Sequence, residues 1–326
     1  MSDAPYPWQR QQWSQLQAQI AQGRLPHALL LSGIPGLGKM AFALSLTQAI
    51  LCEQPTGEGR ACGVCRSCQL YVAGTHPDRL LVQPESPDKP IRIDAVRGLI
   101  EFLTFSPSLK SRRVVVVQPA DALNVFAANS LLKTLEEPAS AALLMLVTDR
   151  PTRLPATVRS RCQSLRFGAP AVAETRVWLN ERLGEAGRAT VALARANGAP
   201  LAALEYADEA GLKQRARLIE GLGQLVKGRA DVGELADELA DTISRTLLDT
   251  LAAWLRDLIR VGNGAGVREN PDFERELLAC REGLDLARLF ECLDQTQRLH
   301  GLLGNGLNAA LQLEALLIRY RAAVKQ

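Results

Sequence analysis

Four of the seven cysteines fall within 17 residues, at Cys52, Cys62, Cys65 and Cys68. Thiolates at this spacing suit tetrahedral zinc, and three glycines in the same segment allow tight turns between the ligands. A site closed by four cysteines leaves no open position for water. The pattern therefore predicts a structural zinc site and not a catalytic one.

Other interpretations of the same cysteines are a redox-active Cys-x-x-Cys pair, an iron–sulfur cluster, or chance. The presence of Cys52 and Cys68 beside one pair makes redox chemistry the poorer interpretation. The remaining cysteines are scattered, and the odd total argues against a disulfide framework. We interpret those three as ordinary buried thiols.

A second segment has the residue types of a phosphate-binding loop. Residues 33–40 read Gly-Ile-Pro-Gly-Leu-Gly-Lys-Met and fit the pattern G-x-x-x-x-G-K-[ST] except at the last position. In such a loop the backbone N–H groups and the lysine hold phosphates, and the Ser or Thr hydroxyl holds Mg²⁺. The candidate phosphate-binding residues are Gly33, Gly36, Gly38 and Lys39, but the thioether of Met40 is a poor ligand for Mg²⁺.

The acidic half of a hydrolytic site is also missing. An Asp-Glu pair is expected after the apolar run 114–117, where the sequence has Gln118 and Pro119. Asp121 is displaced from that position, and we predict that it caps the next helix. The pattern leaves two interpretations open, weak ATP binding or a glycine turn that binds no nucleotide.

Short apolar runs alternate with helical patterns in the first half of the chain, which predicts a buried parallel sheet. The expected strands are 28–31, 80–83, 114–117 and 143–147, and the expected helices include 40–51, 94–105 with Asp94 as its N-cap, and 123–135. From residue 169 only helices are expected, namely a small helical group at about 171–208, a helix with an apolar stripe from 247 to 259, and a final pair at 284–303 and 307–323.

The composition, with 47% apolar and 22% charged residues, is typical of a globular protein. Its 326 residues favour two or three domains. The net charge of +3 is too small to predict DNA binding by the chain alone, which disfavours an independent zinc-dependent nucleic-acid binder. No apolar run approaches the roughly 20 residues of a membrane span, and the start lacks the layout of a signal peptide, so we expect a cytoplasmic protein.

Several segments together resemble the clamp-loader subunits of bacterial DNA polymerase III. These segments are residues 26–33, the cysteine segment with Gly74-Thr-His-Pro-Asp78 after it, Ala127-Ala-Asn-Ser-Leu-Leu-Lys-Thr-Leu-Glu-Glu-Pro138, Ser160-Arg-Cys162, and residues 305–317. The resemblance covers essentially the whole chain. The run ending at Pro138 and the Ser-Arg-Cys triplet are its most specific parts.

Departures from the motor subunits (gamma/tau) of that family indicate which type this chain resembles. Motor subunits keep Lys-Thr or Lys-Ser, Asp-Glu and a sensor arginine, where this chain has Lys39-Met40, Gln118-Pro119 and Leu201. The resemblance implies the stator type, which does not itself hydrolyse ATP. The chain is then no enzyme alone but part of the DNA-directed DNA polymerase III holoenzyme, a nucleotidyltransferase complex. A working motor ATPase that tolerates Met40 is the alternative.

The resemblance also implies an architecture and a set of partners. We expect an AAA+ (P-loop NTPase-like) α/β domain over 1–168 with a zinc module at about 52–68, a small helical lid over 169–209, and an all-α collar over 210–326. Through the collar the chain would join motor (gamma/tau) and delta subunits in a five-subunit ring. That ring uses ATP to load the sliding clamp onto primed DNA during replication.

Arg161 of the Ser-Arg-Cys triplet matches the arginine finger that such a subunit inserts into the ATP site of its neighbour. Its guanidinium would stabilise charge on the γ-phosphate there. Without the family match, Arg159 and Arg161 would be interpreted as surface or ion-pairing arginines. The leucines of residues 131–135 are interpreted as the buried face of a helix, and Glu136 and Glu137 receive no chemical role.

Overall fold

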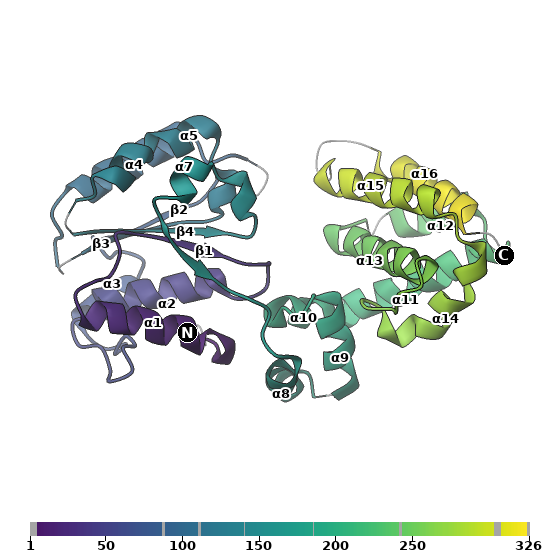
Figure 1. The fold of residues 1–326 in the computed structure, drawn as a ribbon, viewed down its shortest axis with the longest axis horizontal. Helices are drawn as coiled ribbons and strands as arrows, with labels where there is room; N and C mark the ends of the chain where they lie inside the picture. Colours follow the sequence, from purple (N-terminus) through teal and green to yellow (C-terminus); the bar gives the residue numbers. More distant parts are fainter. Residues whose placement is uncertain are drawn as a thin grey trace. The chain divides into compact units, whose positions relative to one another are not determined.

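The chain divides into two compact units, Met1–Pro170 and Ala171–Gln326. The structure, a computed structural model, describes residues 5–86, 89–109, 112–139, 141–184, 186–240, 243–302 and 308–324. Figure 1 shows that strands occur in the first unit, while the second is built from helices. The expected change from an α/β domain to helices is confirmed. Residues 305–307 of the closing family motif lie outside the described residues.

The first unit is built around five parallel strands in the order β2-β3-β4-β1-β5. Their bounds are β1 Ala28–Ser32, β2 Arg79–Val82, β3 Arg113–Val117, β4 Ala142–Thr148 and β5 Gln163–Arg166. The central strands β1 and β4 are buried along their whole length, as continuous apolar runs require. The four expected strands are confirmed, and β5 is an additional edge strand.

Helices cover both faces of this sheet. The helical segments are η1 Pro7–Gln9, α1 Arg10–Ala21, α2 Lys39–Leu51, α3 Arg66–Val72, α4 Ile93–Thr104, η2 Ala120–Ala122, α5 Val125–Ser130, α6 Leu132–Glu136, η3 Pro151–Arg153 and α7 Ala156–Arg159. In Figure 1, α4 and α5 lie above the sheet, and α1, α2 and α3 lie below it. Above the sheet, Leu99 of α4 and Ala127 of α5 pack with Val115 of β3 in one apolar core.

Two helix boundaries differ from the sequence prediction. The predicted N-cap Asp94 is wrong, because α4 begins at Ile93 and Asp94 lies in its first turn, where its carboxylate accepts a hydrogen bond from Arg97. The helix predicted over 123–135 consists of the two short segments α5 and α6, with Leu131 between them. Asn124 caps α5, because its side chain accepts the backbone N–H of Ala127.

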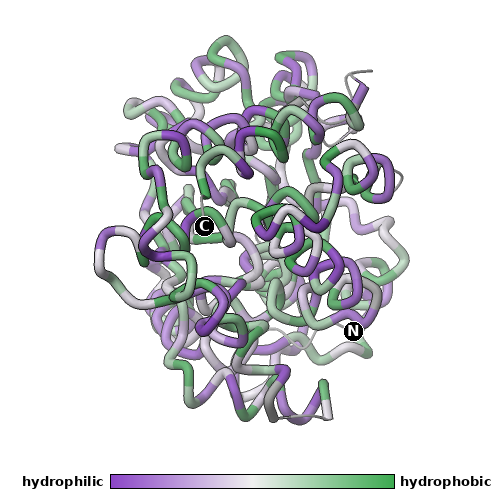
Figure 2. Tube along the Cα trace, turned by 90° about the vertical axis from the view of Figure 1, so that its right-hand side faces the viewer, coloured by the Kyte–Doolittle hydropathy of each residue, from purple (hydrophilic) through white to green (hydrophobic). Residues whose placement is uncertain are grey.

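The described residues of the second unit form helices joined by loops, with no β-strand among them. Its segments are α8 Val172–Leu183, α9 Ala186–Arg195, α10 Pro200–Tyr206, α11 Glu209–Val226, α12 Val232–Ala240, α13 Arg245–Gly262, η4 Pro271–Phe273, α14 Glu274–Ala279, η5 Arg281–Gly283, α15 Leu286–Leu302 and α16 Ala309–Ala323. The tube in Figure 2 alternates between hydrophobic and hydrophilic residues along many helical turns, as amphipathic helices do. The predicted stripe of α13 is buried, and Trp254 on it donates a 3.0 Å hydrogen bond from Nε1 to Tyr320 Oη.

A buried carboxylate holds the loop that follows α13. Asp257 is fully buried and accepts hydrogen bonds from the backbone N–H groups of Arg268, Glu269 and Asn270. The side-chain amide of Asn270 donates a further bond of 2.9 Å to it. Because all four partners are donors, only an acceptor-rich side chain satisfies this loop.

We expect Asp257→Asn to destabilise the helical unit by about 2 to 3 kcal/mol, since an amide would place its own N–H₂ against these donors. The measurement is the free energy of unfolding in urea, followed by circular dichroism. Asp237, exposed on α12, provides the matched control, and Asp237→Asn should stay within about 0.5 kcal/mol of the parent. Equal stability of Asp257→Asn and the parent would contradict the assigned role of the carboxylate.

Candidate functional site

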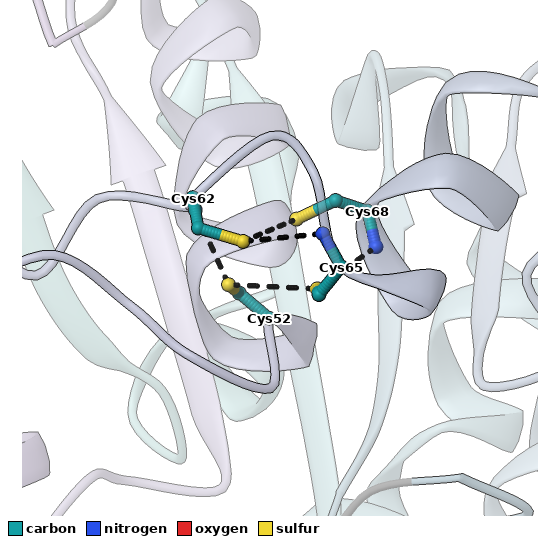
Figure 3. A group of neighbouring side chains, drawn as sticks. All are labelled: Cys52, Cys62, Cys65 and Cys68. Atoms are coloured by element: carbon teal, nitrogen blue, oxygen red, sulfur yellow. Dashed lines mark hydrogen bonds between the residues drawn. The ribbon is translucent and has the colours of Figure 1, made fainter.

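The four clustered cysteines converge on one point, as their spacing predicts. Cys52 follows α2, Cys62 lies in the connecting loop, and Cys65 and Cys68 belong to the start of α3. Their Sγ atoms all lie within 4.8 Å of one another, with 3.9 Å between Cys52 and Cys65 and 4.0 Å between Cys62 and Cys68. Figure 3 shows the four sulfurs facing inward. Four Zn–S bonds of about 2.3 Å place tetrahedral sulfurs about 3.8 Å apart, so these residues fit one metal ion.

Backbone N–H groups donate hydrogen bonds to three of these sulfurs. The N–H groups of Cys62, Cys65 and Cys68 donate to Cys52, Cys62 and Cys65 Sγ, over 3.2 to 3.4 Å. Burial works to raise the pKa of Cys65, but hydrogen bonds from the Cys68 and Glu53 backbone and the neighbouring thiols bring it to about 6. The pKa of Cys62 is lowered by backbone bonds from Val64 and Cys65, whereas burial raises the pKa values of Cys52 and Cys68. The cluster thus favours the thiolate, the form that binds metal, at two of its four positions.

Ser67, between two of the cysteines, connects the cluster to the sheet. Its hydroxyl donates to the carbonyl of Leu51 and lies 2.7 Å from Nε2 of His76. The N–H of Asp78 donates to Nδ1 of the same ring, so His76 carries its proton on Nε2. Burial lowers the pKa of His76, which is 4% exposed. His76 therefore has a polar structural role, and it links the cysteine segment to the start of β2.

The predicted phosphate loop follows β1 and leads directly into α2. Gly38 has a φ of +79°, and a Cβ there would lie 2.6 Å from the ring of Tyr6. At Gly33 a Cβ would lie 2.3 Å from the carbonyl oxygen of Phe167, which follows β5. Two side chains of the N-terminal segment, Trp8 and Gln9, donate hydrogen bonds to the carbonyl of Leu37. Gly33 and Gly38 are thus required by close packing of neighbouring segments against the loop.

Lys39, the phosphate ligand predicted by the motif, has protein partners of its own. Its Nζ lies 2.6 Å from Oδ1 of Asp149 and donates a 2.7 Å hydrogen bond to the carbonyl of Ile34. Asp149 directly follows β4, and the lysine side chain is only 4% exposed. A phosphate at this loop would have to displace Asp149 or share the lysine with it.

The position expected for the acidic pair contains no carboxylate. Gln118 follows β3 and accepts a 2.8 Å hydrogen bond from the side-chain amide of Gln83, and Pro119 comes next through a cis peptide bond. The prediction that Asp121 caps the next helix is wrong, because Asp121 lies in the 3₁₀ turn η2 and Asn124 is the cap. The carboxylate of Asp121 instead accepts a 2.6 Å hydrogen bond from the hydroxyl of Thr148.

Arg161 lies just after α7, and an acidic residue that the sequence reasoning passed over holds it. Its Nε and Nη2 both donate to Oε1 of Glu136, the last residue of α6, and its Nη1 donates to the carbonyl of Thr157. The side chain of Arg161 is 34% exposed. The next residue, Cys162, is buried in the core, and burial raises its pKa to about 11. The triplet thus combines an anchor in the core with an arginine at the surface.

The structure therefore brings together the cysteines in one place and the loop residues in another. The side-chain hydrogen bonds of Arg161 within the described residues go to Glu136 and Thr157 and not to the loop at residues 33–39. Leu201, where the family resemblance leads us to expect a sensor arginine in a motor subunit, belongs to α10 in the other compact unit. Glu136 is the partner of Arg161 that the sequence does not reveal, because the two residues are 25 positions apart. The one local signal for Glu136 is its charge within a helical run.

Over the described residues, no helix has the length and apolar character to cross a membrane.

Comparison with known proteins identifies the family. The family described as "DNA polymerase III, delta subunit" matches residues 8–171, and "DNA polymerase III, delta subunit, C terminal" matches residues 209–322. DNA polymerase III subunit delta' of Pseudomonas aeruginosa is 36% identical over 324 residues, with 97% of each chain covered.

Two Escherichia coli proteins show how the chain relates to different subunits. The delta' subunit of that organism is 34% identical over 317 residues, covering 96% of this chain and 94% of its own. Its tau subunit is 29% identical over 257 residues, covering 76% of this chain and 38% of tau. Identity to delta' thus extends over nearly the whole of both chains. The chain belongs to the family of DNA polymerase III delta' subunits.

Proposed function

We propose that this chain is the stator of a DNA polymerase III clamp loader, which uses ATP bound by other subunits to place the sliding clamp on primed DNA. The unit Met1–Pro170 would be its AAA+ domain, carrying the zinc module, while residues 171–209 would form the lid and 210–326 the collar. In the proposed five-subunit ring, its partners are the motor (gamma/tau) and delta subunits. The chain would contribute to the polymerase complex in the cytoplasm without hydrolysing ATP itself.

The observation that carries this proposal is the state of the phosphate loop. Lys39 is paired with Asp149, Met40 offers no hydroxyl for Mg²⁺, and Gln118 and Pro119 replace the acids that would bind metal and activate water. A site that lacks its metal ligands loses the Mg²⁺ that would neutralise the charge developing on a transferred phosphoryl group. ATP binding by this loop is not part of the proposed function.

Arg161 is the residue by which such a chain can still act on ATP. It is partly exposed after α7, so its guanidinium is accessible to a neighbouring molecule. In other NTPases an arginine supplied in trans stabilises the charge of the phosphoryl-transfer transition state. We assign Arg161 as the arginine finger.

The metal proposed for the cysteine cluster is structural zinc. Four soft thiolate ligands favour zinc over Mg²⁺ or Ca²⁺, and they leave no coordination position for a reacting water. The segment that carries them is fixed to the rest of the unit by Ser67 and by the indole of Trp13, which donates a 3.0 Å hydrogen bond to the carbonyl of Glu58. Zinc would hold this segment folded beside α1.

We expect purified protein to contain about one equivalent of zinc and Cys65→Ser to retain much less, because three ligands hold zinc more weakly than four. The measurements are metal analysis by mass spectrometry and the thermal midpoint, which should fall with the loss of metal. Cys280→Ser is the matched control, since this cysteine lies on another unit and should leave the zinc content unchanged. Less than half an equivalent in undenatured protein would contradict the assignment.

In a complex reconstituted with the motor and delta subunits, Arg161→Ala should leave assembly intact and lower DNA-stimulated ATP turnover several-fold. The reason is that one ATP site of the ring would lose a group whose removal costs about 10³-fold or more at a single site in other NTPases. Arg159→Ala is the matched control, because Arg159 is exposed two residues away. Turnover equal to the parent complex in the Arg161 variant would refute the finger role.

The alternative of a working motor ATPase is tested on the isolated chain. We expect no Mg²⁺-dependent ATP hydrolysis above the buffer background, because Gln118 and Pro119 stand where carboxylates would have to bind the metal and activate the water. The measurement is phosphate release at saturating ATP. Hydrolysis that disappears in Lys39→Ala would establish the motor function and overturn the proposal.

A further inference from the structure

The contact between Glu136 and Arg161 joins two segments that the sequence keeps apart. Glu136 is 51% exposed and Arg161 34% exposed, so the pair is in contact with solvent. Ion pairs of this kind contribute little to stability, and folding alone does not require one here. The two donors from Arg161 nevertheless meet a single carboxylate oxygen, Oε1. Such a geometry restricts the rotation of the guanidinium.

The contacts with Glu136 and Thr157 leave part of the Arg161 guanidinium available to a ligand. A guanidinium carries five N–H bonds. In the described residues Glu136 takes one from Nε and one from Nη2, and the carbonyl of Thr157 takes one from Nη1. Two N–H bonds remain, one on each terminal nitrogen. A guanidinium can bind two oxygens of one phosphate through two parallel N–H bonds.

We propose that Glu136 is a positioning residue for Arg161, fixing the Nε side of the guanidinium so that the terminal nitrogens are presented to the triphosphate of a nucleotide in the adjacent subunit. The inference rests on the finger role assigned to Arg161 above. Glu136 itself does not bind the nucleotide, because a carboxylate would be repelled by phosphate, and it acts only through the arginine. An arginine without this partner would sample several orientations and lose part of its effect on turnover.

The test uses the reconstituted complex with five versions of this chain: Glu136→Ala, Glu136→Gln, Arg161→Ala, the double variant Glu136→Ala/Arg161→Ala, and Glu137→Ala. Glu137 is the matched control, because it is an exposed carboxylate next in sequence. DNA-stimulated ATP turnover is measured as kcat and KM, and complex assembly and the thermal midpoint are measured for each version.

We expect Glu136→Ala to lower kcat by about twofold or more, less than Arg161→Ala does, with a smaller change in KM for ATP. Glu136→Gln should recover part of the loss, since its amide oxygen still accepts from the arginine. The double variant should match Arg161→Ala alone, because a residue that acts through Arg161 has no effect once Arg161 is absent. Glu137→Ala should match the parent.

The failure of this inference is distinguishable from the failure of the proposed function. If Arg161→Ala lowers turnover and Glu136→Ala does not, only the positioning role is overturned. The positioning role is also overturned if turnover in the double variant is lower than in Arg161→Ala alone. It is overturned as well if Glu136→Ala impairs assembly of the complex and Glu137→Ala lowers turnover by the same amount. If Arg161→Ala leaves turnover unchanged, the finger role and the inference fall together.

Discussion

Parallel pairing of the five strands determines where the loops of the first unit come together. Because β1 pairs in parallel with both β4 and β5, and β3 pairs with β4, their carboxyl ends lie along one edge of the sheet. The candidate phosphate loop after β1, Gln118 after β3 and Asp149 after β4 therefore lie at the same edge. Lys39 meets Asp149 only because β1 and β4 are neighbours, although the two residues are 110 positions apart in the chain.

Two cations of this unit are held by carboxylates from other segments, with different consequences. Lys39 is almost fully buried and bonded to both Asp149 and a loop carbonyl, so little of it is presented to a ligand. Arg161 is a third exposed and retains two N–H bonds beyond those taken by the described residues. The same kind of ion pair thus leaves little of Lys39 accessible to a ligand and, in the proposed finger role, orients Arg161. The difference follows from solvent access and from the five donors of a guanidinium against the three of an ammonium.

The sequence predicts structure correctly where the physical signal is local. Continuous apolar runs identify the strands β1, β3 and β4, since a strand buried on both faces must be apolar throughout. It misses β5, in which only Leu165 is buried, because an edge strand with one apolar residue has no distinct pattern. It also predicts the wrong caps for α4 and α5. Asp94 and Asp121 are plausible caps by residue type, but Asp94 lies within the first turn of α4 and Asp121 lies in the 3₁₀ turn before α5.

Residue types and short spacings are sufficient to predict the cysteine set, the candidate phosphate loop and its missing acids, and the division into a strand-containing part and a helical part. All of these depend on residue type and on spacing over a few residues, which chain connectivity preserves. Three contacts depend on tertiary packing instead: Asp149 with Lys39, Thr148 with Asp121, and Glu136 with Arg161. These contacts join residues 25 to 110 positions apart, and strand order and helix packing, not local composition, bring them together.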